Sequence, residues 1–431
     1  MTRGTRVCAL VVVLALVAAT GWSAAVAGAR VRAGSDTQGI TDTEIRVGGV
    51  GGFSVNPVNL PYDEMVDGVK AYFAMVNEED GGVFGRKLTV VKMRDDASQS
   101  VKNLLQTRAL VEEDEVFAVM PVATIGFAGA RYLTKNGVPA FGYHISNDWE
   151  DAPNLFGETG SATCFDCADP TYPWLAKQLG ATRIGIIGYN VDIAQDCVRW
   201  QKKSYNKFGF KMPYVNDVLA FGFTESSFAS DIEKMKQAKI DMLSTCMDSN
   251  GSLLIKQAMD AAGLKIPVQW GEGYNHDFLA QFGQELDGLH LSISEQPFED
   301  PLPSEGMQNY LEWMQKTGGN VHKISLAGWI VADLFVEGLK AIGKNPTRSK
   351  LIKAINKMDD FTAHGVTSGI DWTKAHHDTS EGQSCRAFLK VDNGQYVQEF
   401  AEPGKPFVCL DGKAKSLDDF TVRAAGLNQS P

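Results

Sequence analysis

Several polar and aromatic side chains that could bind a small organic molecule stand just after expected strands. Thr124 and Ser146 carry hydroxyl groups, His144 carries an imidazole, and Glu272 carries a carboxylate that could pair with an ammonium group. The other members of this set are Tyr189, Asn190, Cys246, Met247, Asp248 and Tyr274. Ligands of α/β proteins bind beyond the carboxyl ends of the strands, and such a mixture of groups is typical of small-molecule sites. Taken singly, these residues are more often helix caps or loop residues, and Glu272 could cap a helix near Asn275.

The sequence lacks the short motifs of common catalytic and nucleotide-binding sites. It has no Gly-x-Ser-x-Gly turn, no His-Glu-x-x-His pair and no phosphate loop ending in Gly-Lys-Ser or Gly-Lys-Thr. The glycine run over 48–52 has the wrong spacing for a dinucleotide loop and favours a tight turn beside a ligand. His376, His377 and Asp378 could belong to a metal site, but they lack a matched further ligand, which favours a solvated turn. We therefore expect no cofactor, no metal and no catalytic residue.

The first 29 residues have the pattern of an export signal. Arg3 and Arg6 precede an apolar stretch over 7–20, and Ala25-Val26-Ala27 is typical of a cleavage site. The alternative is an uncleaved membrane anchor, but the apolar stretch is shorter than the roughly 20 residues that cross a bilayer. Since no other stretch suits a membrane span, we expect a protein of the periplasm, cell envelope or extracellular space, with no membrane insertion after signal removal.

The balance of charges excludes some partners. The chain of 431 residues has 41 Lys and Arg against 52 Asp and Glu, a formal net charge of −11, and no basic runs. Phosphate contacts need clustered Lys and Arg, so we expect no nucleic acid partner. The same charge argues against docking on anionic lipid.

Six cysteines follow the export signal, and an even number in an exported chain favours disulfide bonds. Cys385 and Cys409 flank a hairpin expected from residues 387–391 and 396–400, so we pair these two first. Cys164 and Cys167 have the spacing of redox and zinc motifs, but no second such pair exists, which favours a structural disulfide. The pairing of these two with Cys197 and Cys246 stays open.

Expected strands and helices alternate over residues 45–293. The strands cover 45–50, 87–93, 116–120, 138–142, 183–188, 214–219, 240–245, 268–271 and 289–293. The first helices cover 62–79 and a segment from about Ser98, whose hydroxyl could cap it. This alternation predicts an α/β fold with parallel sheets covered on both faces. A stretch rich in Gly, Ser, Pro and Cys over 158–173 separates two doubly wound units.

Helices without strands follow Pro297, at 304–317, 326–342 and 348–358. Such helices have to pack on a sheet that already exists. We therefore expect the chain to return to the first unit and then to cross again, before an antiparallel hairpin from Phe388 onward.

The segment 77–96 is the most informative local pattern. Gly81, Gly82 and Gly85 stand where a helix must end and the chain must reverse. A buried strand follows, and Asp95 and Asp96 come directly after it, which we expect to be loop or rim residues. Behind an export signal, this unit indicates a secreted binding protein rather than a cytosolic enzyme.

An ordered series of motifs carries a resemblance to a known family. The motifs are Gly39-Ile40-Thr41-Asp42-Thr43-Glu44-Ile45-Arg46-Val47-Gly48, Asn77 with Gly81-Gly82 and Gly85, Asp95-Asp96, Gly137-Val138-Pro139, Gly263-Leu264-Lys265, Trp270-Gly271-Glu272-Gly273 and Gly369-Ile370-Asp371-Trp372. Together they resemble the type I periplasmic solute-binding proteins, in particular the branched-chain amino acid binding family of ABC transporters. The resemblance covers nearly all of the chain after the export signal.

The resemblance implies two Rossmann-like lobes joined by a hinge of three crossing strands. The first lobe would comprise residues 40–160 and 297–367, and the second 161–296 and 368–431. It also implies a site where hydroxyls and backbone amides of the first lobe bind a ligand carboxylate and Glu272 binds an ammonium group. The first-lobe positions are Ala123, Thr124, Ile145 and Ser146.

This sequence departs from the family pattern at three positions of the implied site. Ile193 and Asp248 stand where amino-acid binders often carry tyrosines, and His144 is unusual beside the cleft. A carboxylate, an amide or an aromatic acid would therefore fit the altered pocket, as well as an amino acid.

The expected function is capture of a small organic solute that is handed to an ABC permease, by a protein that is a monomer and not an enzyme. One alternative is a ligand-sensing module for a membrane receptor. Another is a secreted hydrolase that uses Glu272 and Asp248 as an acid–base pair.

Overall fold

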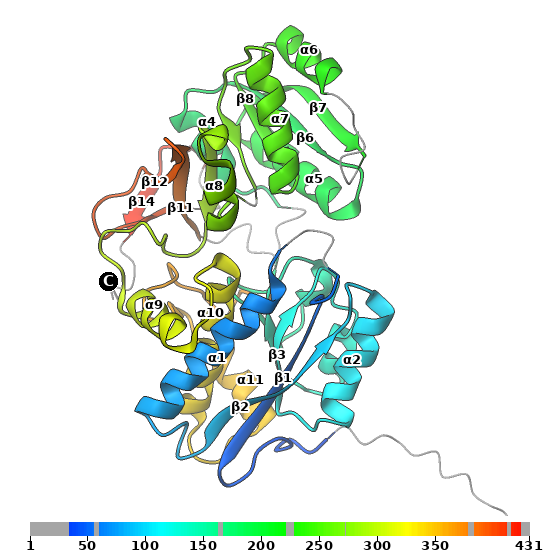
Figure 1. Ribbon diagram of the computed structural model, residues 1–431, viewed down its shortest axis with the longest axis vertical. Coiled ribbons are helices and arrows are strands. Elements are labelled where there is room, and N and C mark those ends of the chain that lie inside the picture. The colour runs from blue at the N-terminus through cyan, green and yellow to red at the C-terminus, as the bar shows by residue number, and fades with distance from the viewer. Residues whose placement is uncertain are drawn as a thin grey trace, which may run out of the picture. The chain divides into compact units, whose positions relative to one another are not determined.

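The computed structural model in Figure 1 describes residues 34–55, 60–162, 167–220, 228–271, 273–377, 383–411 and 415–423. The expected export signal, Cys164, Glu272 and Asp378 lie outside these residues. The architecture is α/β with two separate sheets, so the predicted fold class is confirmed. Within the described residues, no helix combines the length and the apolar character that a membrane span requires.

The first sheet has five parallel strands in the order β2-β1-β3-β4-β5. They are β1 (Glu44–Gly51), β2 (Lys87–Asp95), β3 (Ala118–Ala123), β4 (Ala140–Gly142) and β5 (Leu155–Gly157). Every residue of β3, β4 and β5 is buried, which explains their continuous apolar sequences. Because the strands are parallel, the loops that follow them meet at one edge of the sheet.

Two layers of side chains cover the faces of this sheet. Along β3, Ala118 and Met120 pack in a core with α1 (Tyr62–Glu79), whereas Val119 and Val122 pack in a core with α2 (Ser100–Glu112) and α3 (Ala130–Lys135). Ala118, Val119 and Met120 alternate between the two faces, and a shift in the register of β3 between Val119 and Val122 places Val122 in the same core as Val119.

The helix α2 begins two residues later than expected. Ser98 has a positive φ of 56° and its hydroxyl donates to the Val55 carbonyl at 2.7 Å, so it does not cap the helix. The Asp96 carboxylate accepts the Ser98 backbone N–H at 2.7 Å, which forms a turn before the helix starts. The predicted capping role of Ser98 was therefore wrong.

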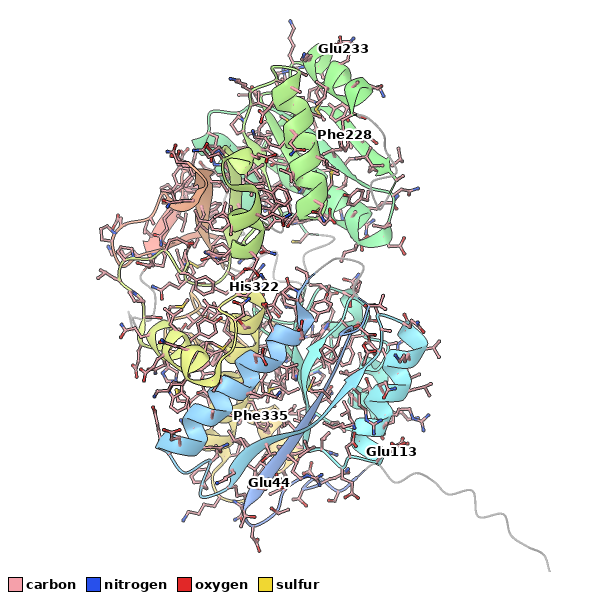
Figure 2. The ribbon with its side chains drawn as sticks, viewed as in Figure 1. Glu44, Glu113, Phe228, Glu233, His322 and Phe335 are labelled. Atoms are coloured by element: carbon pink, nitrogen blue, oxygen red, sulfur yellow. A yellow bond between two sulfur atoms is a disulfide. The ribbon has the colours of Figure 1, made fainter. Side chains whose placement is uncertain are left out.

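Three helices from late in the chain complete the core beside α1. They are α9 (Glu305–Thr317), α10 (Lys323–Ile342) and α11 (Arg348–Ile355). The ring of Phe335, labelled in Figure 2, lies 6.2, 6.2 and 5.4 Å from the rings of Phe73, Phe117 and Phe141. The buried Arg348 guanidinium donates to the carbonyls of Phe117 and Val116 at 2.9 and 2.6 Å. Residues 305–355 thus return to the first sheet.

Two glycines allow α1 and α10 to pack with their backbones almost in contact. A Cβ atom on Gly68 would lie 1.8 Å from the Ser325 carbonyl oxygen, and one on Gly328 would lie 2.1 Å from the Met65 carbonyl oxygen. Neither obstacle is a flexible side chain, so a larger residue would force the two helices apart.

We expect Gly328→Ala to destabilise the protein by about 2 kcal/mol or more, although Gly→Ala inside an exposed helix usually stabilises by up to 1 kcal/mol. The comparison variant is Gly338→Ala on the same helix, where the added Cβ meets the movable side-chain ends of Leu351 and Ile355 and should cost less. Urea unfolding followed by circular dichroism would measure both. Equal stability of Gly328→Ala and the unmodified protein would contradict this packing.

The second sheet has nine strands in the order β14-β13-β11-β10-β9-β8-β6-β7, with β12 pairing β11. Its parallel part comprises β6 (Arg183–Tyr189), β7 (Lys211–Leu219), β8 (Met242–Cys246), β9 (Val268–Gln269) and β10 (Leu289–Ile293). Its helices are α4 (Thr171–Gln178), α5 (Asp192–Lys207), α6 (Ala229–Ala238), α7 (Ser249–Ala261) and α8 (His276–Phe282). The strands expected from 183 to 293 are therefore confirmed, with shifts at their ends, and helices alternate with them as expected.

The C-terminal part adds antiparallel strands to this sheet. They are β11 (Gln383–Asp392), β12 (Gln395–Glu399), β13 (Phe407–Asp411) and β14 (Phe420–Arg423). The expected hairpin is formed by β11 and β12, whereas β13 and β14 were not anticipated. A disulfide joins Cys385 of β11 to Cys409, its directly opposite partner on β13, as predicted. A second disulfide joins Cys197 of α5 to Cys246 at the end of β8, and Cys167 is also disulfide-bonded.

Three crossing segments carry the chain between the two sheets, and hydrogen bonds connect them. The first follows β5, the second follows β10, and the third precedes β11. The backbone N–H groups of Ser161 and Ala162 donate to the Ala375 carbonyl at 2.8 and 3.1 Å. The Gln296 N–H donates to the Val366 carbonyl at 2.7 Å, and the adjacent Glu295 forms an antiparallel bridge with Thr367. The three crossing segments therefore form one hydrogen-bonded hinge.

Candidate functional site

The loops after β3 and β4 bring together the predicted carboxylate-binding positions of the first sheet. Ala123 ends β3 and is fully buried, Thr124 follows it with 2% exposure, and Ile145 and Ser146 are partly buried in the loop after β4. Within the part of the chain that the structure describes, the backbone N–H groups of Thr124, Ile145 and Ser146 donate no hydrogen bond. Neighbouring N–H groups of this kind can together bind an anionic oxygen.

Asp148 joins these two loops, and no sequence pattern marked it beyond its place after β4. Its Oδ2 atom accepts the Phe127 backbone N–H at 2.8 Å and the Ser146 hydroxyl at 3.1 Å. The Ser146 hydroxyl, which we predicted as a ligand donor, is therefore used inside the protein. The Asp148 carboxylate positions the backbone of both loops.

His144 faces a buried acid. Its backbone N–H and its Nδ1 atom lie 3.1 and 3.2 Å from Oε2 of Glu158, which directly follows β5 and is 5% exposed. Burial raises the pKa of Glu295 in the second crossing segment; Lys323 opposes this rise, and the nearby charge of Glu158 adds to it. The structure therefore connects His144 to the hinge through Glu158.

The two acids at the end of β2, Asp95 as its last residue and Asp96 directly after it, close loops. Burial alone would raise the pKa of Asp95, but its carboxylate accepts the Ser54 hydroxyl and backbone N–H at 2.6 and 3.1 Å, and these hydrogen bonds hold its pKa well below the usual range. Asp96 accepts the side-chain amide of Asn103 at 2.7 Å. Both carboxylates therefore hold loops; Asp96 is a loop residue as expected, whereas Asp95 still belongs to the strand.

In the second sheet, Tyr189 and Asp248 contact each other after β6 and β8. The Tyr189 hydroxyl donates to Oδ1 of Asp248 at 3.0 Å, and the same oxygen accepts the Gly251 N–H at 2.9 Å, so Asp248 caps α7. Burial and the negative charge of Asp248 raise the pKa of Tyr189 far above its usual value. Ile193, in the first turn of α5, is 38% exposed. Asp248 thus acts as a helix cap.

Tyr274 contacts the second crossing segment. Its hydroxyl donates to Oε2 of Glu299 and accepts the Phe298 backbone N–H, both at 2.7 Å, and its ring stacks on Phe298 with centroids 5.4 Å apart. The following residue, Asn275, caps α8 by accepting the Phe278 N–H at 3.0 Å. The capping role that was the alternative for Glu272 is therefore taken by Asn275.

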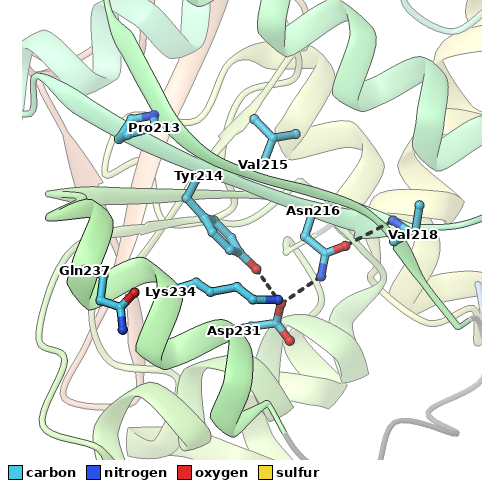
Figure 3. A pocket seen from close by; sticks show the side chains of 8 residues that line it. All are labelled: Pro213, Tyr214, Val215, Asn216, Val218, Asp231, Lys234 and Gln237. Atoms are coloured by element: carbon cyan, nitrogen blue, oxygen red, sulfur yellow. Dashed lines mark hydrogen bonds between the residues drawn. The ribbon is translucent and has the colours of Figure 1, made fainter.

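A surface pocket of about 490 Å³ lies elsewhere on the second sheet, between β7 and α6 (Figure 3). The Asp231 carboxylate is its most engaged group, since Oδ1 accepts the Tyr214 hydroxyl at 2.7 Å and the Asn216 amide at 2.8 Å. None of the predicted site residues lines this pocket. The site predicted at the strand ends therefore remains a prediction separate from this pocket.

The two adjacent histidines between α11 and β11, His376 and His377, behave differently from each other. His377 is exposed and pairs with Asp151 at 2.6 Å, as a solvated turn requires. His376 is only 5% exposed, and its ring lies 5.4 Å from the rings of both Phe156 and Trp372. The prediction of a solvated turn was therefore wrong for His376, because Trp372 and Phe156 form an apolar wall around it.

Acid is expected to destabilise the protein through His376. Burial, and then the nearby His377, lower its pKa to about 4 from a usual value of 6.5. The unfolded chain therefore binds a proton below pH 6.5 that the folded protein rejects until about pH 4, so stability falls over this window as pH decreases, by up to about 3 kcal/mol. Chemical unfolding between pH 4 and 7 should show a weaker pH dependence in His376→Phe, whereas His377→Ala should keep it. The same slope in both variants would contradict this assignment.

Comparison with known proteins agrees with this architecture. The family described as periplasmic binding protein matches residues 44–395, and the chain belongs to this family. Comparison with curated proteins gives no match. Its fold is that of type I periplasmic binding proteins, because many solved structures of this kind superpose on it.

Three of these structures illustrate the range of ligands that such proteins contain. A branched chain amino acid ABC transporter protein from Thermus thermophilus with bound valine shares 16% identity at a TM-score of 0.69, over 84% of this chain and 97% of that one. A solute binding protein from R. palustris in complex with 4-hydroxybenzoate shares 21% identity at 0.65, over 83% and 95%. A branched-chain amino acid transporter substrate binding protein from Streptococcus pneumoniae with isoleucine shares 16% identity at 0.65, over 83% and 100%. Identities this low establish the shared fold.

Proposed function

We propose that this protein is the extracytoplasmic solute-binding protein of an ABC importer and captures one small organic solute between two closing lobes. The lobes comprise residues 40–160 with 297–367, and residues 161–296 with 368–431. The observation that carries the proposal is the family match together with clustered polar groups at the strand ends of both sheets. The partner is the membrane permease, and the protein works as an exported monomer that returns its ligand unchanged.

The solute class that this site suits is a small carboxylate. The backbone N–H groups of Thr124, Ile145 and Ser146 support this, since adjacent loops hold them close together and Asp148 positions both loops. Valine, isoleucine and 4-hydroxybenzoate, which the similar structures contain, all carry a carboxylate. Glu272 would bind an ammonium group if the ligand is an amino acid.

Closure of the lobes would depend on contacts that the solute makes to both of them. A ligand shifts an open–closed equilibrium only by its different affinity for the two states. The hydrogen-bonded hinge of three segments would allow each lobe to move while its own sheet stays intact.

The hydrolase alternative is not favoured by the geometry of Asp248. Its Oδ1 atom already accepts the Tyr189 hydroxyl and the Gly251 N–H, so it holds a helix and a tyrosine in place. A general base has to be available to a substrate proton within about 3 Å. Mass spectrometry of recovered ligand separates the two functions, because a hydrolase would release altered product.

A thermal-shift screen should identify the solute class. We would test leucine, isoleucine, valine, their amides, 4-hydroxybenzoate and a short fatty acid against the purified protein. A ligand at 100 times its dissociation constant adds about 2.7 kcal/mol of stability and should raise the melting temperature by several degrees. The proposal is abandoned if no small carboxylate or amide shifts the transition.

The strongest ligand from that screen should bind more weakly to Thr124→Ala and Glu272→Ala. Each substitution removes one expected partner of the bound solute, so we expect a loss of about 1–3 kcal/mol by isothermal calorimetry. Matched controls are the exposed residues Thr43 and Glu233, whose substitution by alanine should leave affinity unchanged. If the ligand has no ammonium group, Glu272→Ala should leave its affinity unchanged. Unchanged affinity in both Thr124→Ala and Glu272→Ala would refute the site assignment.

A further inference from the structure

A cluster of three potential metal ligands lies in the first-sheet core, apart from the strand-end site. Asp333 and Glu337 are four residues apart on α10 and therefore share one helix face. His364 reaches them from the turn after α11, and one ligand atom of each residue lies within 4.8 Å of the other two. Nothing in the proposed solute-binding function uses these groups.

Asp333 is the unusual member, because it is a fully buried carboxylate on an apolar helix. Its Oδ1 atom accepts the Tyr72 hydroxyl at 2.5 Å and lies 3.5 Å from Nε2 of His364. Its Oδ2 atom is buried and has no hydrogen-bond partner among the described residues. Buried carboxylate oxygens are nearly always paired or coordinated, because an unpaired one loses the hydrogen bonds that it makes with water.

We propose that Asp333, Glu337 and His364 bind one first-row divalent cation of the Zn²⁺ or Mn²⁺ type. Two carboxylates and one imidazole balance the charge of such an ion and leave positions open for water. Ligands at about 2.0–2.2 Å from one ion lie at most about 4.4 Å apart, so small side-chain rotations would complete the site. The nitrogen ligand favours these metals over Mg²⁺ and Ca²⁺, which prefer oxygen.

The surroundings of the cluster are consistent with a site that binds its cation reversibly. Glu337 is partly exposed and pairs with Lys340 at 3.2 Å, and the side chain of His364 is 48% exposed, so both can reorient toward an incoming ion. Tyr72 on α1 anchors Asp333 from the other side. An ion here would join α1, α10 and the turn that leads into the third crossing segment.

A proton and a metal ion compete for the imidazole of His364. The hydrogen bond to Asp333 and the charge of Asp333 raise the pKa of His364 to about 9, with smaller contributions from Glu337 and Glu305. At neutral pH the imidazole is therefore protonated, and metal binding has to release that proton. The alternative to the proposed site is a permanent ion pair between His364 and Asp333.

The test is calorimetric titration of untagged, chelator-treated protein with Zn²⁺, Mn²⁺ and Mg²⁺. We expect one saturable site for Zn²⁺ or Mn²⁺, at least tenfold tighter than for Mg²⁺, with a rise in melting temperature. His364→Ala and Glu337→Gln should each weaken binding at least tenfold; both side chains are partly exposed, so these variants should fold. The matched controls His377→Ala and Glu312→Gln, at exposed residues away from the cluster, should bind normally.

A titration without a saturable site would overturn the proposal, and the cluster would then be explained by the ion pair between His364 and Asp333. Binding that survives in both His364→Ala and Glu337→Gln would also overturn it, because the cation would then occupy another place. Visible absorption of the Co²⁺ form adds a direct readout, since loss of the imidazole changes its ligand-field bands only if His364 coordinates. None of these outcomes bears on solute binding, whose failure would appear in the separate ligand screen.

Discussion

A parallel sheet has to be covered on both faces, and this constraint determines how the whole chain is organised. The first sheet obtains one covering layer locally, from α2 and α3. The other layer combines α1 with helices that arrive only after the parallel part of the second sheet is complete, at residues 305–355. The chain therefore has to leave the first sheet, return to it, and leave it again. Three crossing segments are a consequence of covering the sheet, and the hinge consists of those segments.

The close packing of the helices at residues 305–355 against α1 and the first sheet then contributes to the stability of that sheet. Gly68 and Gly328 let α1 and α10 approach until backbone meets backbone, and Phe335 places its ring among the aromatic rings of the sheet. The return also accounts for two buried polar groups, since the Arg348 guanidinium satisfies the carbonyls of Val116 and Phe117 just before β3 begins. Helices that are remote in sequence therefore complete the hydrogen bonding of the sheet as well as its core.

The parts of the fold that follow local rules could be predicted from the sequence. Helix α1 has the predicted bounds because its apolar residues recur at helical spacing. Strand β6 could be recognised by its continuous apolar run and ends only one residue later than predicted. The Cys385–Cys409 disulfide was predicted because the two cysteines flank the expected hairpin, although they meet through the pairing of β11 with β13, a strand that was not anticipated. The failures depended on distant partners: the Ser98 hydroxyl donates to the Val55 carbonyl, and the ring of Phe156 packs against His376. Local patterns carry no information about such contacts.

In the candidate site, too, local features could be predicted from the sequence and distant contacts could not. Strand ends could be found from the sequence, and so could the residues that follow them, but not the partners of those residues. His144 meets Glu158, Ser146 meets Asp148, Tyr189 meets Asp248 and Tyr274 meets Glu299. The acids that complete these pairs lie up to 59 residues away in sequence, in the case of Tyr189 and Asp248.

These pairs also favour the proposed binding function of the strand-end residues over a catalytic function. Side chains that satisfy each other are held in single rotamers, so the loops that carry them present a preorganised backbone to a ligand. Preorganisation lowers the entropy that binding would otherwise cost. A catalytic acid or base needs the opposite arrangement, a proton acceptor or donor left open to the substrate. At the described strand ends, the carboxylates of Asp95, Asp148 and Asp248 are occupied by internal donors, which leaves backbone N–H groups as the groups best placed to recognise a solute.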